Sequence, residues 1–215
     1  HMYTVGLGSV ANSAFGISTI LIAVPTGVKI FNWMGTLWGG SISFNTPLMF
    51  CLGFITMFTI GGLTGVTHSM VPSDYQQQDT YYIVAHFHQV LFGGAIFGLF
   101  AGIYYWFPKV TGKMLNETIG QIHFWIMFVS FNMTFIPMFY PGLHGMNRRI
   151  ATYTPDLQGI NIFISSMAFI LGSSFLIFIA NMCYSLVWGP KAAADPWRAR
   201  TLEWRVSSPP RVSSR

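Results

Sequence analysis

The sequence predicts an all-α integral membrane protein, on three observations. Hydrophobic residues make up 52% of the 215 positions. Only 8% are charged, whereas a soluble domain carries about a quarter charged residues. Five apolar segments are each long enough to cross a bilayer as a helix, which takes about 20 residues. Because nothing between these segments is long enough to form a soluble domain, we expect most of the chain to lie in lipid.

The predicted helices follow one another with short connections. They run over 9–34, 46–66, 81–107, 119–140 and 159–188. Small residues recur at every fourth position in the second and third segments and predict faces on which helices approach closely. These residues are Gly61, Gly65, Gly94, Gly98 and Gly102.

The first segment carries one charged side chain, Lys29. Thr26 lies three residues earlier on the same helical face, after Pro25, which is expected to kink the helix and free a carbonyl group. One interpretation is a lysine that extends to the membrane surface. The other is a proton-conducting element in which Thr26 relays to Lys29 through water. None of the five segments has an Asp or Glu near its centre, so a carboxylate-based proton route would have to come from elsewhere.

The third segment carries His86 and His88 near its start. Two residues of a helix that are two positions apart project about 200° apart around its axis, so these side chains cannot easily bind one metal ion together. Each can instead offer an imidazole to a different group, and neutral imidazole is a common axial ligand of haem iron. The bland alternative is two histidines that bond backbone carbonyls of neighbouring helices.

Loop 67–80 precedes this segment and contains Asp74 and Asp79. Carboxylates there could bind a hard cation, or they could belong to a solvated and capped helix start. The other internal histidines are assigned structural roles: His68, His123 and His144.

The charges predict an orientation. Lys109, Lys113 and the segment 191–215 fall on one side of a chain with five spans, which the positive-inside tendency makes cytoplasmic. Six of the eleven basic residues are in that last segment: Lys191, Arg198, Arg200, Arg205, Arg211 and Arg215. We therefore divide the chain into a membrane bundle, 1–190, and a basic cytoplasmic tail, 191–215. A basic tail beside apolar segments indicates a membrane flank and no nucleic-acid partner.

Arg148 and Arg149 lie on the opposite side, against this tendency. They predict either an anionic partner at that surface or a local ion pair with Asp156.

Several motifs resemble subunit I of the haem-copper oxygen reductases, the cytochrome c oxidase family. The run DTYYIVAHFH over 79–88 is similar to the family signature DTYxVVAHFH, and IAVPTGVKIF over 22–31 is similar to the family segment IAVPTGVKIF. Three further matches, in order and at the family spacing, are GIYYWFP over 102–108, GMNRRI over 145–150 and TLEW over 201–204.

The resemblance implies roles for these residues. His86 would be the proximal ligand of the high-spin haem and His88 an axial ligand of the low-spin haem, with Phe87 between the two rings. Arg148 and Arg149 would pair with haem propionates, and Asp74 would lie in the propionate region. Lys29 and Thr26 would belong to the lysine proton pathway of the family.

Copper and magnesium are also implied. His1 falls where the family has the second histidine of a copper-ligating pair, and residues 2–6 continue the HHMxTVG pattern. Asp79 lies in the region of the magnesium site, but Gln78 stands where the family commonly has a magnesium-ligating histidine. Two further departures, Gln89 and Asn147, touch no haem or copper ligand.

The family implies a twelve-helix subunit I, of which this chain would be the C-terminal part. The upstream helices and the remaining metal ligands would come from elsewhere, because subunit I is split or because the chain is a piece of a longer one. The assembled enzyme would reduce dioxygen to water and translocate protons. It would use two haems, for which the family implies type a, together with copper.

The implied partners are an electron-entry subunit, membrane lipid and cytochrome c as the electron donor. The location would be a bacterial or archaeal plasma membrane or the mitochondrial inner membrane, with the tail on the cytoplasmic or matrix side. Two alternatives stay open: a quinol-oxidising member of the superfamily, and an inactive fragment retained for assembly.

Overall fold

The computed structural model of the chain describes residues 2–199 and 201–210 and contains five helices that are long and apolar enough to cross a membrane. They cover Gly8–Leu37, Thr46–Thr67, Tyr81–Thr111, Glu117–Leu143 and Pro155–Trp188. Each lies within a few residues of a predicted segment, so the all-α membrane fold and its five spans are confirmed.

The third to fifth spans are built from several pieces, and shorter helices lie in the connections. In chain order the elements are α1 (Gly8–Leu37), α2 (Thr46–Thr67), α3 (Val71–Gln77), α4 (Tyr81–Leu91), the π-helix η1 (Phe92–Ile96), α5 (Phe97–Thr111), α6 (Glu117–Phe135), α7 (Phe139–Leu143), the 3₁₀ turn η2 (Pro155–Leu157), α8 (Gln158–Trp188) and the 3₁₀ turn η3 (Leu202–Arg205).

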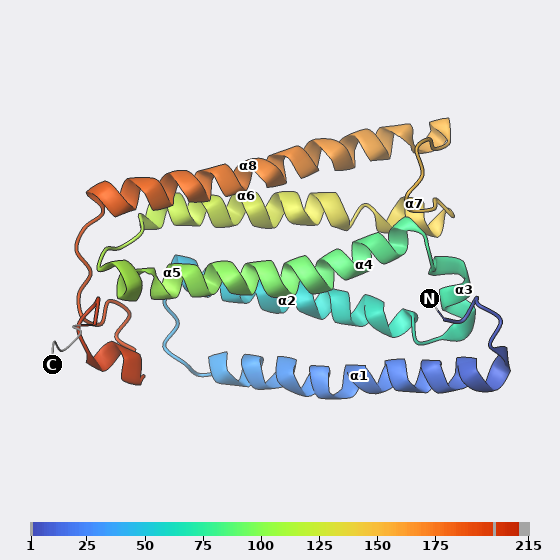
Figure 1. The fold of residues 1–215 in the computed structure, drawn as a ribbon, viewed down its shortest axis with the longest axis horizontal. Coiled ribbons are helices and arrows are strands. Elements are labelled where there is room, and N and C mark those ends of the chain that lie inside the picture. Colours follow the sequence, from blue (N-terminus) through green and yellow to red (C-terminus); the bar gives the residue numbers. More distant parts are fainter. Residues whose placement is uncertain (1, 200, 211–215) are drawn as a thin grey trace, which may run out of the picture.

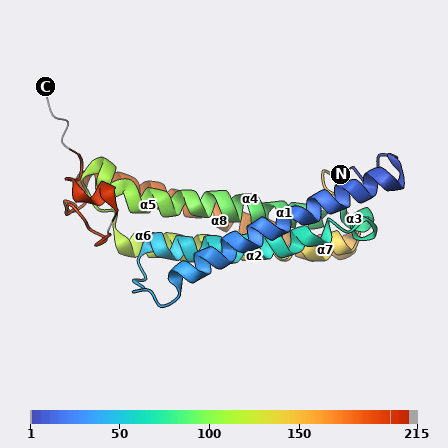
Figure 2. The same ribbon diagram turned by 90° about the horizontal axis from the view of Figure 1, so that it is seen from below.

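The long helices lie side by side in a shallow layer, nearly in the order of the chain (Figure 1). The most extensive contacts join α6 with α8 and α2 with α4 and α5, whereas α1 packs mainly on α2. Seen from below, α1 crosses the layer obliquely on one face (Figure 2). The most apolar stretch of α1 contains no buried residue, so its apolar side chains are open to whatever surrounds the chain.

The core is rich in phenylalanine and lies where α2, α5 and α6 meet. Phe50, Phe97 and Phe131 are fully buried, and the Phe50 and Phe97 rings are 5.7 Å apart. Close approach of α2 and α4 depends on small residues, because a Cβ atom at Gly61 would lie 2.8 Å from a methyl carbon of Val90. Gly98 behaves differently: a Cβ there would meet nothing within 4 Å, so this part of the predicted packing stripe has no neighbour in the described chain.

The connection after α5 and the segment after α8 meet at one end of the layer (Figure 1). Met114 N donates to Pro190 O at 2.9 Å, and Ala192 N donates to Gly112 O at 2.8 Å. The Lys109 Nζ donates to Val206 O at 2.8 Å, which holds the last described residues against the bundle. The lysine loop and the described part of the tail therefore lie at the same end of the bundle, as the five predicted spans require.

Candidate functional site

The helix that carries the two histidines begins at a well-defined cap. Thr80 is the N-cap residue of α4, and its hydroxyl oxygen accepts from Tyr82 N at 3.2 Å. The segment around Arg148 is joined to this cap: Tyr81 N donates to Met146 O at 3.0 Å, and Arg148 N donates to Asp79 O at 2.8 Å. Residues far apart in sequence are thus brought to the start of α4.

His86 is half-buried and faces α2. Its Nδ1 lies 3.0 Å from the Thr64 hydroxyl oxygen. A Cβ atom at Gly65 would lie 2.9 Å from Cε1 of the ring, so only glycine leaves room for the imidazole there. A ring that is held at Nδ1 in this way can bind a metal ion through Nε2.

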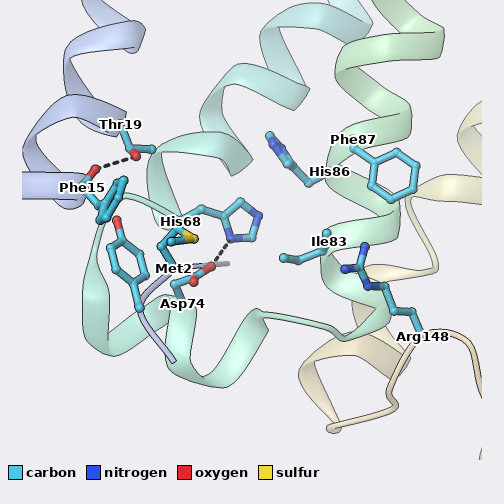
Figure 3. Close-up of a pocket in the computed structure, with 10 residues that line it drawn as sticks. Met2, Phe15, Thr19, His68, Asp74, Ile83, His86, Phe87 and Arg148 are labelled. Atoms are coloured by element: carbon cyan, nitrogen blue, oxygen red, sulfur yellow. Dashed lines mark hydrogen bonds and ion pairs between the residues drawn. The ribbon is translucent and has the colours of Figure 1, made fainter. Parts of the chain in front are cut away.

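The His86 ring borders two cavities. The first, which we call the Arg148 cavity, has a volume of about 360 Å³ and includes Phe15, His68, Asp74, His86, Phe87 and Arg148 in its lining (Figure 3). The second, the Thr26 cavity, has a volume of about 260 Å³ between α1 and α2 and is lined by Thr26, Gly61, Gly65, His68 and His86 among others. Most of the surface that lines each cavity is apolar, which suits a large apolar ligand with a few polar anchors.

His88 points to a different neighbour. Its ring stacks on Phe135 of α6, with centroids 4.1 Å apart and planes 15° apart, and its Nδ1 lies 2.8 Å from Val84 O. The two histidines therefore face different helices, as the helical geometry predicted. Phe87 lies between them in sequence, lines the Arg148 cavity and packs against His88 with ring centroids 4.5 Å apart. One turn beyond, α4 passes into the π-helix η1, a local widening that is frequent at functional sites.

The ion pair of Arg148 is with Asp79 and not with Asp156. Arg148 Nε donates to Asp79 Oδ1 at 2.9 Å, and the terminal guanidinium nitrogen Nη2 contacts the same oxygen. The prediction of an ion pair at Arg148 is right, but the predicted partner Asp156 is wrong. The partner is Asp79, 69 positions away in the sequence. Arg149 is exposed and has a positive φ of 64°, and no described contact brings its side chain into the Arg148 cavity.

Asp74 is the buried carboxylate of the site. Its side chain is 3% exposed, and Oδ1 lies 3.2 Å from Nδ1 of His68. The sequence predicts a structural role for His68, because a histidine at the end of an apolar run carries no periodic signal. The structure places its ring 4.7 Å from the His86 ring.

The described residues do not assemble the predicted magnesium site. Asp79 is bonded to Arg148, Asp74 is bonded to His68, and Gln78 carries no carboxylate. Within 2–199 and 201–210 no group of three His, Cys, Asp or Glu side chains could hold a metal ion. The donor set therefore does not fit magnesium, and we derive no step through that ion. His1, the predicted copper ligand, lies outside the described residues.

Thr26 and Lys29 are both on α1 but are not equivalent. Thr26 lines the second cavity together with His86, and its hydroxyl donates to Ile22 O at 2.8 Å. Lys29 is exposed on the same helix. Helix α1 continues through Pro25 without a break.

His123 lies on α6 and is fully buried against α5, with Nδ1 3.2 Å from the Tyr104 hydroxyl oxygen. His144 is exposed and bonds Tyr140 O at 2.9 Å through Nδ1. Neither borders the two cavities at His86.

Comparisons with known proteins point to one family. Residues 1–173 match the family model described as cytochrome c and quinol oxidase polypeptide I. Cytochrome c oxidase subunit 1 of a Synechocystis species is 50% identical over 214 residues, which cover 100% of this chain and 39% of the relative. The same subunit of Bacillus subtilis is 45% identical over 98% of this chain and 34% of the relative. The chain thus spans less than two fifths of the length of these curated relatives.

A solved structure of a heme-copper terminal oxidase dimer shares the fold. The TM-score is 0.71 at 16% identity, and the match covers 90% of this chain and 39% of the other.

Proposed function

The chain belongs to the cytochrome c and quinol oxidase polypeptide I family, and we propose that it forms part of the catalytic subunit of a respiratory terminal oxidase. The assembled enzyme would reduce dioxygen to water with electrons from cytochrome c and translocate protons. The compared relatives are cytochrome c oxidase subunits 1, which favours cytochrome c over quinol as the donor. One observation carries the proposal: His86 and His88 leave one helix toward different neighbours, and His86 borders two largely apolar cavities.

His86 fits the role of axial ligand to the high-spin haem. Thr64 holds Nδ1, which sets the orientation of the ring and leaves Nε2 as the nitrogen that would bind the iron. Gly65 leaves room for the His86 ring itself, and Gly61 and Gly65 line the Thr26 cavity beside that ring. When bound, the haem-copper centre supplies the electron transfer and the reduction of oxygen, and the chain supplies ligation, orientation and the exclusion of water.

His88 fits the role of one axial ligand of the low-spin haem. The bond from Nδ1 to Val84 O selects the tautomer whose Nε2 carries the lone pair, and stacking on Phe135 limits rotation of the ring. Phe87 borders the Arg148 cavity and touches His88, so it would lie between the two haems.

Arg148, Arg149 and Asp74 would act at the propionate end of the haems. Arg148 opens onto the same cavity as His86 while Asp79 fixes its guanidinium. Guanidinium groups bind carboxylates in this fixed and charge-assisted geometry.

Thr26 and Lys29 would carry protons toward the site from the other end of α1. Thr26 supports this assignment because its side chain reaches a cavity that His86 also lines. The remaining ligands, including those of copper beside His1, would come from the upstream helices of subunit I.

We propose a multi-pass location in a respiratory membrane, with 191–215 as a cytoplasmic or matrix tail beside the 1–190 bundle. The complex would include an electron-entry subunit.

Difference spectra of the purified complex that contains this chain test the proposal. Reduced-minus-oxidised spectra report both haems, and carbon monoxide difference spectra report the high-spin haem. We expect His86→Ala to abolish the carbon monoxide signal and His88→Ala to abolish the low-spin signal, because each removes one iron ligand. The matched control is His144→Ala, which removes an exposed imidazole from the same half of the molecule and should change neither spectrum. A complex with no carbon monoxide-binding haem would favour the inactive assembly fragment, and an unchanged carbon monoxide signal in His86→Ala would refute that ligand.

A further inference from the structure

We propose that His68, oriented by Asp74, binds a carboxylate of the haem that His86 ligates. This inference rests on the proposed function and assigns a role to a side chain that neither the motifs nor the comparisons single out. It makes His68 a positioning residue for the haem, acting at its carboxylate edge and not at the iron.

The pair is built into the fold. His68 is the C-cap residue of α2, and Asp74 lies in the first turn of α3. Nδ1 of the imidazole is 3.2 Å from Oδ1 of the carboxylate, and the two side chains are 12% and 3% exposed. The edge of the His68 ring also meets the Tyr82 ring, with centroids 5.4 Å apart and planes 85° apart. These contacts give the imidazole a defined orientation.

The pair is incomplete, however. Nε2 of His68 and Oδ2 of Asp74 are both buried and have no hydrogen-bond partner among the described residues. A buried polar atom without a partner is destabilising, and most buried polar side-chain atoms in native structures have one. Two such atoms on adjacent side chains indicate that a polar group occupies this position when the site is complete.

The place of His68 shows which ligand would bring that group. Its ring meets the His86 ring at 64°, with centroids 4.7 Å apart, and it lines both cavities that His86 lines. Figure 3 shows the His68 and His86 imidazoles next to each other, with Asp74 joined to His68 by a dashed line. A ligand held by His86 in these cavities would therefore pass beside His68.

The other polar side chains of the Arg148 cavity have partners within the chain or a proposed role of their own. Tyr3 donates its hydroxyl to Ser69 O at 3.3 Å, and Thr19 donates to Phe15 O at 2.7 Å. The guanidinium of Arg148 is bonded to Asp79. Arg148 keeps N–H groups that Asp79 does not use and would serve a propionate as well. Nε2 of His68 is buried, has no partner among the described residues and, unlike Nε2 of His86, is not assigned to the iron.

A carboxylate is the polar group that suits this position. The propionates are the negatively charged substituents of haem, and a propionate beside Asp74 would place two negative charges together unless a donor lay between them. With Nδ1 turned to Asp74, Nε2 is the ring atom that would donate to the propionate.

Two amide replacements separate this role from a purely structural one. His68→Asn keeps an amide near the position of Nδ1 and retains the bond to Asp74, whereas His68→Gln reaches the position of Nε2. The purified complex is measured by redox titration of the high-spin haem and by vibrational spectra of the haem carboxylates. We expect His68→Asn to lower the midpoint potential and shift a carboxylate band, because a donor beside the haem is lost. We expect His68→Gln to stay close to the unmodified complex.

His68→Asn keeps Asp74 paired, so assembly should survive and leave the spectra readable. His144→Asn serves as a control for an exposed histidine. Normal potential and carboxylate bands in His68→Asn would overturn the inference, and so would an equal shift in both His68 variants. Failure of the proposed function looks different, because the unmodified complex would then lack a carbon monoxide-binding haem altogether.

Discussion

At the residue scale, the site depends on what lies next to each imidazole. Thr64 holds Nδ1 of His86 and Gly65 leaves space for its ring, while Val84 O and Phe135 orient His88. Neither Thr64 nor Phe135 stands out in the sequence, because each acts through one contact with a helix elsewhere in the chain. The geometry of the proposed haem ligands is therefore set by ordinary side chains.

Gly65 tests this dependence. We expect Gly65→Ala to displace the His86 ring, because the new Cβ would lie 2.9 Å from Cε1. Overpacking of this kind costs about 1–3 kcal/mol. The carbon monoxide difference spectrum should lose amplitude, while the low-spin signal at His88 should remain. Gly172→Ala is the control, because a Cβ there meets nothing within 4 Å. Equal spectra for the two variants would contradict the expected crowding at His86.

Lys29 separates the two interpretations that the sequence left open. If Lys29 conducts protons, Lys29→Met should lower turnover roughly a hundredfold, as expected for loss of a proton-transfer group, without changing either haem spectrum. If Lys29 only extends to the membrane surface, turnover should change little. Lys113→Met is a suitable control, since that ammonium group donates to Leu186 O at 2.7 Å and Val187 O at 2.8 Å at the end of α8.

At the element scale, helix ends carry much of the arrangement. Asn45 and Asn116 cap α2 and α6, accepting from Leu48 N at 3.2 Å and Ile119 N at 3.0 Å. The Glu117 carboxylate accepts from Thr46 N at 2.6 Å, which ties the start of α6 to the start of α2. These bonds matter because helix ends in a membrane protein expose backbone groups that need partners.

The cap of α4 gives a prediction at this scale. Thr80→Ala removes the acceptor for Tyr82 N and the donor to Gln77 O, which are 3.2 Å and 2.6 Å away. We expect the free energy of unfolding to fall by about 0.5–2 kcal/mol, the usual cost of losing such a cap. A lower midpoint of thermal denaturation would show it. Thr80→Ser keeps the hydroxyl and should lose much less, and equal losses in both variants would assign the effect to packing of the methyl group.

At the scale of the whole molecule, the two ends of the layer differ in charge. One end holds Lys109, Lys113 and the described part of the tail. The other end holds Asp79, Arg148 and the Arg148 cavity. The orientation of these ends in the membrane stays a prediction from the positive-inside tendency.

Protease accessibility checks that orientation. Arg198 and Arg205 are exposed at the tail end, and Arg149 is exposed at the opposite end. We expect trypsin to cut after Arg198 or Arg205 only in inside-out vesicles and after Arg149 only in right-side-out vesicles. Each site is the internal control for the other. Tail cleavage in sealed right-side-out vesicles would reverse the predicted orientation.

The sequence by itself determined the five spans, the family and the divergence of His86 and His88. Span length and hydropathy are local properties, and the angle between positions i and i+2 of a helix follows from the backbone alone. The tertiary structure decided which side chains meet. Arg148 finds Asp79, 69 positions away, and not the nearer Asp156. His68 finds both Asp74 and His86, because the end of α2 turns back through α3 before α4 begins. These pairings depend on how helices and loops pack, and no periodic pattern in the chain records them.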